Sequence, residues 1–388
     1  MEIVTCIAPI NIAVIKYWGK KCEEKIIPVN DSLSATLALE QMCAKTTIMA
    51  SPNFKENKIW LNGKEESFEN YRLQNCLTEI RNRVRNEEND SKQILSWKIH
   101  ICSENNFPTA AGLASSAAGY ACLVYSLSQL YSIRGDISTI ARQGSGSACR
   151  STLGGWVRWH AGVKDDGSDS IAKEVAPADH WPEMRILVLV VNETQKKCPS
   201  SIGMKNSVLT SQLLKYRAEK CVPERIQQMS QAILEKDFTT FAKLTIQDSN
   251  QFHAVCLDTN PPCFYMNDTS RDIVELVHCF NEVSGSLKVA YTFDAGPNAC
   301  LYLLEETVPI FLSVLNKIFP PNDNDIDYVK GIPIDIPSSV PEEFIKSIPI
   351  KPKTNGLLKY IIYTKVGDGP RLLNDPNEHL LDENGLPK

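Results

Sequence analysis

The 388-residue chain lacks several patterns that would place it in a familiar class. No run of lysine and arginine exceeds two residues and the net charge is −5, which argues against a general nucleic-acid binder. The thirteen cysteines form no CxxC pair and the six histidines no HExxH spacing, so we expect free thiols and no zinc site. The GxxxxGK[ST] segment and the protein-kinase signatures are also missing, which disfavours the P-loop and protein-kinase classes.

The N-terminal segment and the uncharged stretches give no sign of export or of membrane insertion. The first residues have neither the basic start nor the apolar stretch of a signal peptide. Between Glu104 and Arg134 there is no charge, but the serine, threonine, asparagine and glycine content and Pro108 fit a buried helix better than a membrane span. The sequence therefore predicts a cytoplasmic protein that contacts neither membrane nor nucleic acid.

The composition, 43% hydrophobic and 22% charged, is that of an ordinary globular protein. A chain of this length can bury two cores. Strand-like and helix-like segments alternate in the first half, and helices dominate after a buried strand at 186–191. We predict two α+β domains that divide near 185–195, assigned as 1–188 and 189–388, and no internal repeat.

Periodicity and turn residues predict the individual elements. Leu73, Leu77, Ile80 and Val84 recur at helical spacing, and Asn62-Gly63 marks a hairpin turn after a strand. Further helices are expected at about 137–142, 203–219, 224–235, 238–254 and 269–283. Further strands are expected at 97–101, 154–159, 186–191, 288–293, 300–304 and 357–363. The segment 320–355, with seven prolines and many acidic residues, is expected to be irregular, and the tail after 367 extended.

The most informative segment is Phe107-Pro-Thr-Ala-Ala-Gly-Leu-Ala-Ser-Ser-Ala-Ala-Gly-Tyr120. A turn shaped by Pro108 and Gly112 leads into a helix of very small side chains. The unpaired N–H groups and the positive dipole end at such a helix start attract phosphate. Ser115 and Ser116 add hydroxyls that would meet a phosphate or its metal ion. Taken alone, the segment also fits a tightly packed helix without a ligand.

Two other segments carry groups suited to anions. Lys16-Tyr-Trp-Gly-Lys20 offers two point charges for phosphate, with the amide of Asn11 nearby in sequence. It fits a strand edge with Trp18 in the core equally well. In Gly144-Ser-Gly-Ser-Ala-Cys-Arg150, amides and hydroxyls would cradle one anion while the arginine binds a carboxylate; the alternative is a surface turn.

A lone aspartate stands at a tight turn between two apolar strands, in Asp294-Ala-Gly-Pro-Asn298. It either caps the turn or serves as a general base near a transferring phosphoryl group. Arg72, at the start of a helix, and Ser200-Ser201, after the 186–191 strand, are weaker candidates, and Arg72 also fits a solvated helix residue. Two anion cradles, isolated basic groups and one aspartate together indicate a small-molecule kinase or a kinase-like enzyme.

The motifs also resemble a known family. Pro-x-x-x-Gly-Leu-x-Ser-Ser-Ala at 108–117 is similar to the phosphate loop of the GHMP kinase superfamily. The set formed by 16–20, 105–119, 144–151 and Tyr291-Thr-Phe-Asp-Ala-Gly-Pro-Asn-Ala299 resembles the eukaryotic diphosphomevalonate decarboxylases. The kinases usually carry glycine where Ala114 stands, and they lack KYWGK and GSGSACR. The resemblance runs from about residue 5 to Lys388.

The resemblance implies a two-domain α+β fold of the GHMP-kinase type. The N-terminal domain would be ribosomal-protein-S5-domain-2-like, and the C-terminal domain ferredoxin-like, with helices on an antiparallel sheet. It implies an enzyme that uses ATP and Mg²⁺ to phosphorylate the 3-hydroxyl of (R)-5-diphosphomevalonate. Loss of phosphate and CO₂ then gives isopentenyl diphosphate, a precursor of isoprenoids and sterols. Members of the family are commonly homodimers.

The resemblance also implies a role for each matching residue. Asp294 would be the base or orienting carboxylate for the hydroxyl, and Lys16 would lie close to the transferring phosphoryl group. Arg150 would hold the substrate carboxylate, with Asn11 helping to place it. Ser116 would face the ATP phosphates and the metal ion. The remaining substrate-binding set is Tyr17, Trp18, Gly19, Lys20, Arg72, Ser145, Gly146, Ser147, Ala148, Cys149 and Ser201. The remaining ATP-binding set is Asn105, Pro108, Ala111, Gly112, Leu113, Ala114 and Ser115.

The sequence departs from the family pattern at one position, and two other functions remain as alternatives to the decarboxylase. Where the family usually has threonine before Gly-Met, this chain has Ser201-Ile-Gly-Met204; serine keeps the hydroxyl and loses the methyl group, so its placement would be less rigid. A GHMP-type kinase that stops at the phosphorylated product would share many motifs. A non-catalytic member of the fold is disfavoured, because a binding protein would need no base.

Overall fold

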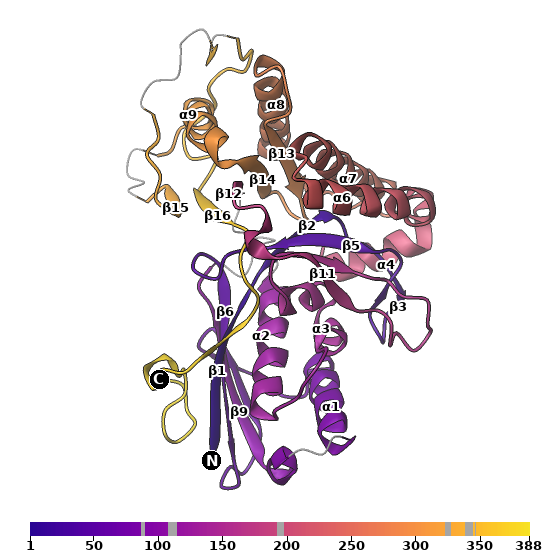
Figure 1. Cartoon of the computed structure of the whole chain (residues 1–388), viewed down its shortest axis with the longest axis vertical. Coiled ribbons are helices and arrows are strands. Elements are labelled where there is room, and N and C mark those ends of the chain that lie inside the picture. Colours follow the sequence, from indigo (N-terminus) through magenta and orange to yellow (C-terminus); the bar gives the residue numbers. More distant parts are fainter. Residues whose placement is uncertain (87–89, 108–114, 192–197, 323–326, 338–343, 346) are drawn as a thin grey trace.

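The computed structural model describes residues 1–86, 90–107, 115–191, 198–322, 327–337, 344–345 and 347–388. Figure 1 shows an N-terminal half with a sheet and helices at the bottom and a C-terminal half with a sheet and helices at the top. A smaller group of strands lies where the two halves meet. Two halves that each combine a sheet with helices agree with the predicted two-domain α+β architecture.

The N-terminal sheet has the strand order β17-β1-β6-β9-β7-β8, with only the β7–β9 pair parallel. Its strands are β1 Glu2–Pro9, β6 Cys43–Ser51, β7 Lys58–Leu61, β8 Lys64–Glu66, β9 Lys98–Asn105 and β17 Arg371–Leu373. The predicted hairpin is confirmed: Asn62 and Gly63, at φ 48° and 78°, form the turn between β7 and β8. Both angles lie in the left-handed region that such two-residue hairpin turns require.

Helix α2 Ser115–Leu130 covers this sheet, and helices α1 Tyr71–Asn86 and α3 Ser138–Gly144 pack against α2 and against each other. The predicted apolar stripe of α1 is buried as expected, from Leu73 to Val84. Helix α2 packs directly on β1 and β6. Ala117, Ala118 and Ala121 are fully buried in that contact, because small side chains let the helix approach the strands closely.

A second sheet, of order β11-β10-β5-β2, lies between the two halves (Figure 1). Its strands are β2 Asn11–Ile15, β5 Ser32–Thr36, β10 Trp156–Trp159 and β11 Ala172–Ala176; the short strands β3 Lys20–Cys22 and β4 Ile27–Pro28 pair beside it. A 3₁₀ helix, Gly146–Thr152, contacts this sheet from the N-terminal half, and helices of the C-terminal half contact it as well. All residues of β2 and β5 are therefore buried.

The C-terminal sheet has the order β13-β14-β12-β16-β15. Its strands are β12 Met184–Val190, β13 Val289–Phe293, β14 Ala299–Leu304, β15 Val329–Gly331 and β16 Tyr360–Lys365. The sheet is antiparallel as predicted, except that β15 runs parallel to β16. The helices of this half are α4 Ser200–Thr210, α5 Gln212–Tyr216, α6 Val222–Glu235, α7 Phe238–Asp258, α8 Asp268–Val283 and α9 Val308–Ile318. No described helix is long and apolar enough to cross a membrane.

The expected helix 203–219 is wrong as a single element. The chain breaks at Ser211, whose hydroxyl accepts a hydrogen bond from the Leu214 N–H and so starts a new helix, α5. A π-helical turn, Arg217–Cys221, then joins α5 to α6. Helix α9 and strand β15 were not expected; β15 lies in the segment predicted to be irregular.

The domain boundary at 188/189 stays a prediction. Strand β12, which contains it, pairs on both sides with strands of the C-terminal sheet. We therefore propose to move the boundary to just before Met184, so that no strand is divided.

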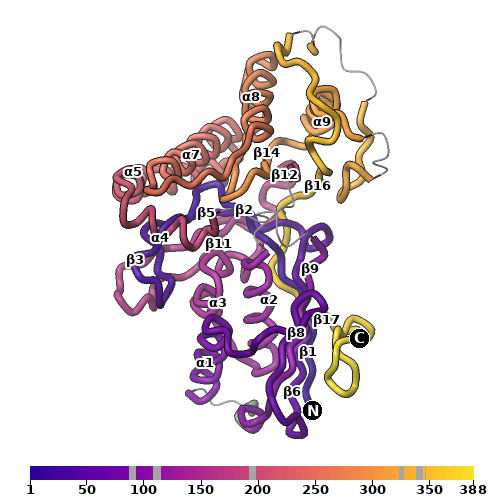
Figure 2. The backbone as a smooth tube through the Cα atoms, turned by 180° about the vertical axis from the view of Figure 1, so that it is seen from behind, coloured from indigo at the N-terminus to yellow at the C-terminus, as the bar shows by residue number. Residues whose placement is uncertain are grey.

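The C-terminal tail returns to the N-terminal half along a tight path. A Cβ on Gly154 would lie 2.5 Å from the backbone N of Gly369, and one on Gly367 would lie 2.4 Å from Ala38 Cα. Glycine alone permits this approach of two backbones. The tail then supplies β17, which pairs with β1 at the edge of the first sheet, so both chain ends lie beside that sheet (Figures 1 and 2).

Candidate functional site

A cavity of about 190 Å³ lies where the two halves meet. Its walls come from β2 and the loop after it, the starts of α1, α2 and α4, the 3₁₀ helix at 146–152, and the turn after β13. Among the described residues that line it, the charged ones are Lys16, Lys20, Arg72, Arg150 and Asp294. Four cations and one carboxylate suit a ligand that carries several negative charges.

Lys16 and Asp294 form an ion pair at the junction of the halves. The Lys16 Nζ lies 2.5 Å from Asp294 Oδ1, although 278 positions separate the residues in sequence. Lys16 follows β2 and is 3% exposed, whereas Asp294 follows β13 and is 32% exposed. Among the described residues, the Asp294 carboxylate therefore accepts its hydrogen bond from Lys16 rather than from the turn that contains Asp294. The carboxylate of Asp294 is also accessible to a ligand.

Arg150 also lines this cavity and is 2% exposed. Its Nε donates to Asn11 Oδ1 (3.1 Å) and Ser34 Oγ (2.9 Å), and its Nη1 donates to Ser32 Oγ. The Asn11 amide group donates in turn to the Ser147 carbonyl (3.0 Å). Burial lowers the pKa of the guanidinium, and nearby acidic groups partly offset this. The network fixes one edge of a buried cation in the cavity, the arrangement that binds a carboxylate in a defined orientation.

The remaining basic and aromatic groups line the outer part of the cavity. Lys20 binds Glu23 (2.6 Å) while most of its side chain is buried. Arg72, the second residue of α1, points inward rather than being fully solvated. The Tyr17 hydroxyl is buried without a hydrogen-bond partner among the described residues, and burial raises its pKa. An unpaired buried hydroxyl in a cavity wall is available for a ligand oxygen.

Trp18 connects the cavity to helix α4. Its ring is buried against Phe252 and Tyr265, and its Nε1 donates to Ser207 Oγ (2.8 Å). Gly203 lets α4 approach Trp18 and Tyr265, because a Cβ there would lie 3.0 Å from the Trp18 ring and 2.4 Å from the Tyr265 hydroxyl. Trp18 therefore belongs both to the core and to the cavity wall, and it holds the start of α4, with Ser201, at the cavity.

Three residues of the predicted substrate set do not line the cavity among the described residues: Gly19, Ala148 and Cys149. Ala148 and Cys149 are fully buried inside the 3₁₀ helix. Gly19 has φ +90°, which favours glycine, and a Cβ there would lie 2.9 Å from the Val208 side chain. We assign these three residues the shaping of the wall; Ser145, Gly146 and Ser147 do line it.

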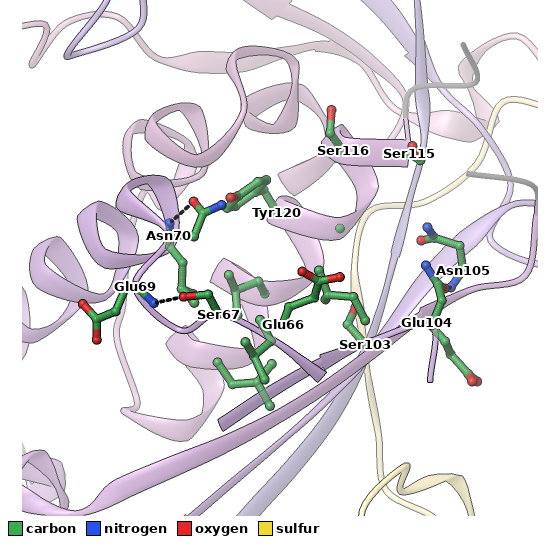
Figure 3. Close-up of a pocket in the computed structure, with 17 residues that line it drawn as sticks. Glu66, Ser67, Glu69, Asn70, Ser103, Glu104, Asn105, Ser115, Ser116 and Tyr120 are labelled. Atoms are coloured by element: carbon green, nitrogen blue, oxygen red, sulfur yellow. Dashed lines mark hydrogen bonds between the residues drawn. The ribbon is translucent and has the colours of Figure 1, made fainter. Parts of the chain in front are cut away.

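A second cavity, of about 500 Å³, lies between the start of α1, the start of α2 and the ends of β7 and β9. Figure 3 shows Ser103, Glu104 and Asn105 on one side of it, Ser67 and Asn70 on the other, and Ser115 and Ser116 at one end. Ser116 lines both cavities, and its hydroxyl lies 3.3 Å from that of Ser145. The start of α2 thus stands where the two cavities meet.

The predicted ATP-binding residues divide into two groups. Asn105, Ser115 and Ser116 line the second cavity. Pro108, Ala111, Gly112, Leu113 and Ala114 lie outside the residues that the structure describes. Asn70, Tyr120, Glu66 and Glu69 also line this cavity, and no sequence motif pointed to them.

Three residues beside the first cavity were not anticipated either: Arg217, Asp248 and His253. Arg217 and Asp248 are fully buried and paired. Burial, together with the charge of Lys16, lowers the pKa of His253 to about 4. The position of Asp248 inside the predicted helix 238–254 is a signal that could have drawn attention to it, because a charged residue is buried only when it is paired.

Comparison with known proteins agrees with this geometry. Residues 8–172 match the family model of the diphosphomevalonate decarboxylase-like N-terminal domain, and residues 186–373 match that of the mevalonate 5-diphosphate decarboxylase C-terminal domain. The chain is 54% identical to the diphosphomevalonate decarboxylase of Danio rerio, over 100% of this chain and 97% of that protein.

Solved structures share the whole fold. The mevalonate diphosphate decarboxylase from Trypanosoma brucei superposes with a TM-score of 0.86 at 34% identity, covering 98% of this chain and 100% of that one. A solved complex of MDDEF with MVAPP, AMPPCP and magnesium gives a TM-score of 0.72 at 28% identity, covering 96% of this chain and 100% of that one. The chain belongs to the diphosphomevalonate decarboxylase family.

Proposed function

We propose that the protein converts (R)-5-diphosphomevalonate and ATP into isopentenyl diphosphate, CO₂, ADP and phosphate. The observation that carries this proposal is one cavity that holds the Lys16–Asp294 pair and Arg150 and meets a second cavity at Ser116. A substrate in the first cavity and a nucleotide in the second would face each other at the start of α2. Membership of the family supports the same reaction.

The charges of the first cavity match the substrate. Arg150, held by Asn11 and two serines, would bind the carboxylate. Lys20 and Arg72 would bind the diphosphate, together with the hydroxyls of Tyr17, Ser145 and Ser201. Binding at both ends would place the tertiary 3-hydroxyl near Asp294.

Phosphoryl transfer then needs little covalent help from the protein. Asp294 would accept the proton of the 3-hydroxyl as its oxygen attacks the γ-phosphorus, and the bond to ADP breaks. Lys16, 2.5 Å from Asp294, would orient the carboxylate and stabilise negative charge on the transferring group. Positioning and charge stabilisation are the main contributions, since the alcohol is hindered.

Decarboxylation completes the reaction. The C3–O bond breaks and phosphate leaves with the bonding electrons; the electrons of the bond to the carboxylate form the new double bond, and CO₂ leaves. Arg150 must therefore orient the carboxylate without holding it so tightly that CO₂ is retained. Its shared hydrogen bonds to Asn11, Ser32 and Ser34 fit that requirement, because they fix its position from the protein side.

The site also fits Mg²⁺ delivered with ATP. The described residues contain no group of three histidine, cysteine, aspartate or glutamate side chains that would hold a metal ion by itself. Mg²⁺ commonly takes phosphates, waters and few protein oxygens, and the hydroxyl of Ser116 would be one of these. Mg²⁺ would neutralise part of the negative charge of the ATP phosphates. The N-terminal end of α2 would favour binding of the same phosphates.

We further propose that the protein is a cytoplasmic homodimer that serves isoprenoid and sterol synthesis. Light scattering after size-exclusion chromatography tests the dimer: a mass of 43.3 kDa, that of one chain, would contradict it.

The function is tested by incubating the protein with diphosphomevalonate and Mg-ATP while ADP, phosphate and CO₂ are followed together. We expect equal release of all three. Release of ADP without CO₂ would identify a kinase that stops at the phosphorylated product. No release at all would support a non-catalytic member of the fold.

A further inference from the structure

A buried ion pair lies behind the catalytic pair and does not face either cavity. Arg217 and Asp248 are both fully buried, and they share two hydrogen bonds, of 2.7 and 2.8 Å. Gln251 accepts from Arg217 (3.0 Å) and from Arg225 (2.6 Å), which also reaches Asp248 (3.3 Å). The cluster joins the π-helical turn before α6 to the middle of α7.

This ion pair holds the main chain of Lys16. The Lys16 N–H donates to Asp248 Oδ1 (2.8 Å), and Arg217 Nη2 donates to the Lys16 carbonyl (3.1 Å). Asn30 Nδ2 donates to the same carbonyl (3.1 Å). Lys16 belongs to the N-terminal half and the ion pair to the C-terminal half, so these bonds fix the lysine across the junction.

The next residue of α7 holds the other partner. Ser249 Oγ accepts a hydrogen bond from the Phe293 N–H (3.1 Å), and Phe293 immediately precedes Asp294. Helix α7 packs against both β2 and β13, the strands that immediately precede Lys16 and Asp294. Two adjacent residues of one helix therefore bind the two strand ends that carry the catalytic pair.

We propose that Asp248, Ser249 and Arg217 are positioning residues that align Lys16 with Asp294 for phosphoryl transfer. This proposal rests on the proposed function. The lysine and the aspartate come from different halves, so small movements between the halves would separate them. Because Asp248 and Ser249 of α7 bind the main chain at Lys16 and next to Asp294, they keep the two side chains aligned when the halves move.

Stability alone gives a weak reason for this arrangement. Burying two charges is costly, and a pair of apolar residues of similar size often serves stability as well or better. The π-helical turn that delivers Arg217 is itself a rare geometry that is frequent at functional sites. Both features are explained if the guanidinium is needed to lock Asp248 onto the Lys16 main chain.

The test compares three variants, Asp248→Asn, Arg217→Lys and Ser249→Ala, in steady-state assays with both substrates. A misplacement of the order of 1 Å can cost about 100-fold, so we expect kcat to fall about 10- to 100-fold. The KM values for diphosphomevalonate and ATP should stay within about 2-fold, because the contacts to both ligands are intact. An increased KM for either substrate with an unchanged kcat would overturn the proposal.

Double variants separate positioning from general damage. In a Lys16→Met background, Asp248→Asn should lower kcat less than about 3-fold further, because it acts through the lysine. Equal losses in both backgrounds would overturn the proposal. Ser313→Ala is the matched control for Ser249→Ala, since it also removes a buried serine hydroxyl that binds a backbone group, 2.9 Å from the Pro337 carbonyl; its kcat should not change.

The small Ser249→Ala change keeps the proposal testable if the ion-pair variants do not fold. A folded Ser249→Ala protein with wild-type kcat would then overturn it. An inactive wild-type protein would instead contradict the proposed function, so the two failures are distinguishable.

Discussion

The side chain of His253 makes the stability of the protein depend on pH in a defined window. Burial is the main cause that lowers its pKa to about 4 from the usual 6.5, and the neighbouring Lys16 adds to the effect. A hydrogen bond with the Phe293 backbone only partly offsets this, and Nε2 has no partner among the described residues. The imidazole is therefore neutral beside the catalytic lysine over the range in which unfolded histidine becomes charged.

The sign and size of the effect follow from these two pKa values. Above pH 6.5 both states are neutral, so His253 adds no pH dependence. Between pH 6.5 and 4 the unfolded chain binds a proton that the folded protein does not, and stability falls as the pH falls. The loss relative to pH 8 is about 2 kcal/mol at pH 5 and at most about 3 kcal/mol at lower pH.

The assay is urea denaturation of the wild-type protein and of His253→Asn at several pH values from 5 to 8, followed by tryptophan fluorescence. Asparagine retains a donor but does not titrate. At pH 8, the difference in the free energy of unfolding between the two proteins reports only the change in packing. By pH 5 we expect this difference to shift by about 2 kcal/mol in favour of the variant. A difference that stays constant across the range would refute the reasoning, since the other histidines are common to both proteins.

Three further predictions concern the cavities. Asp294→Asn should retain substrate binding but lose at least about 100-fold in turnover, because a positioned base contributes about 10²- to 10⁴-fold; near-wild-type turnover would exclude the base. Arg150→Gln should strongly lower turnover with little change in ATP affinity, measured by calorimetry. A selective loss of ATP binding would show that Arg150 contacts ATP and not the substrate carboxylate. Ser116→Ala should lower kcat while the dissociation constant of diphosphomevalonate changes little, since the hydroxyl faces the junction of the cavities; the opposite pattern would assign Ser116 to the substrate alone.

The sequence predicted correctly those structures that depend on a single helix or turn. The spacing of Leu73 and Val84 was sufficient to predict α1, because helical periodicity does not depend on the partner. The same was true of the hairpin at Asn62-Gly63, whose conformation is local. Strand β5 was missed because both of its faces are buried, which removes the alternation that identifies a strand.

The candidate site was predictable as a set of residues but not as an arrangement. Motifs named Lys16 and Asp294, yet their 2.5 Å contact depends on the docking of two sheets whose relation no local pattern encodes. Trp18 was given two alternative roles, core residue or ligand contact; the structure places it in a buried apolar cluster that also forms part of the cavity wall, and the ligand contact stays a prediction. Arg217 and Asp248 carry no motif, and their contact with the Lys16 main chain depends on the packing of α7 against β2.

The return of the C-terminal tail has a consequence for synthesis on the ribosome. Strand β1 is made long before its partner β17, since Thr5 pairs with Leu373. During translation the edge of β1 is therefore an open template for pairing with other chains. Newly made chains should be protected from aggregation only once the tail has docked, so the N-terminal half would need a chaperone for longer than its early position in the sequence suggests.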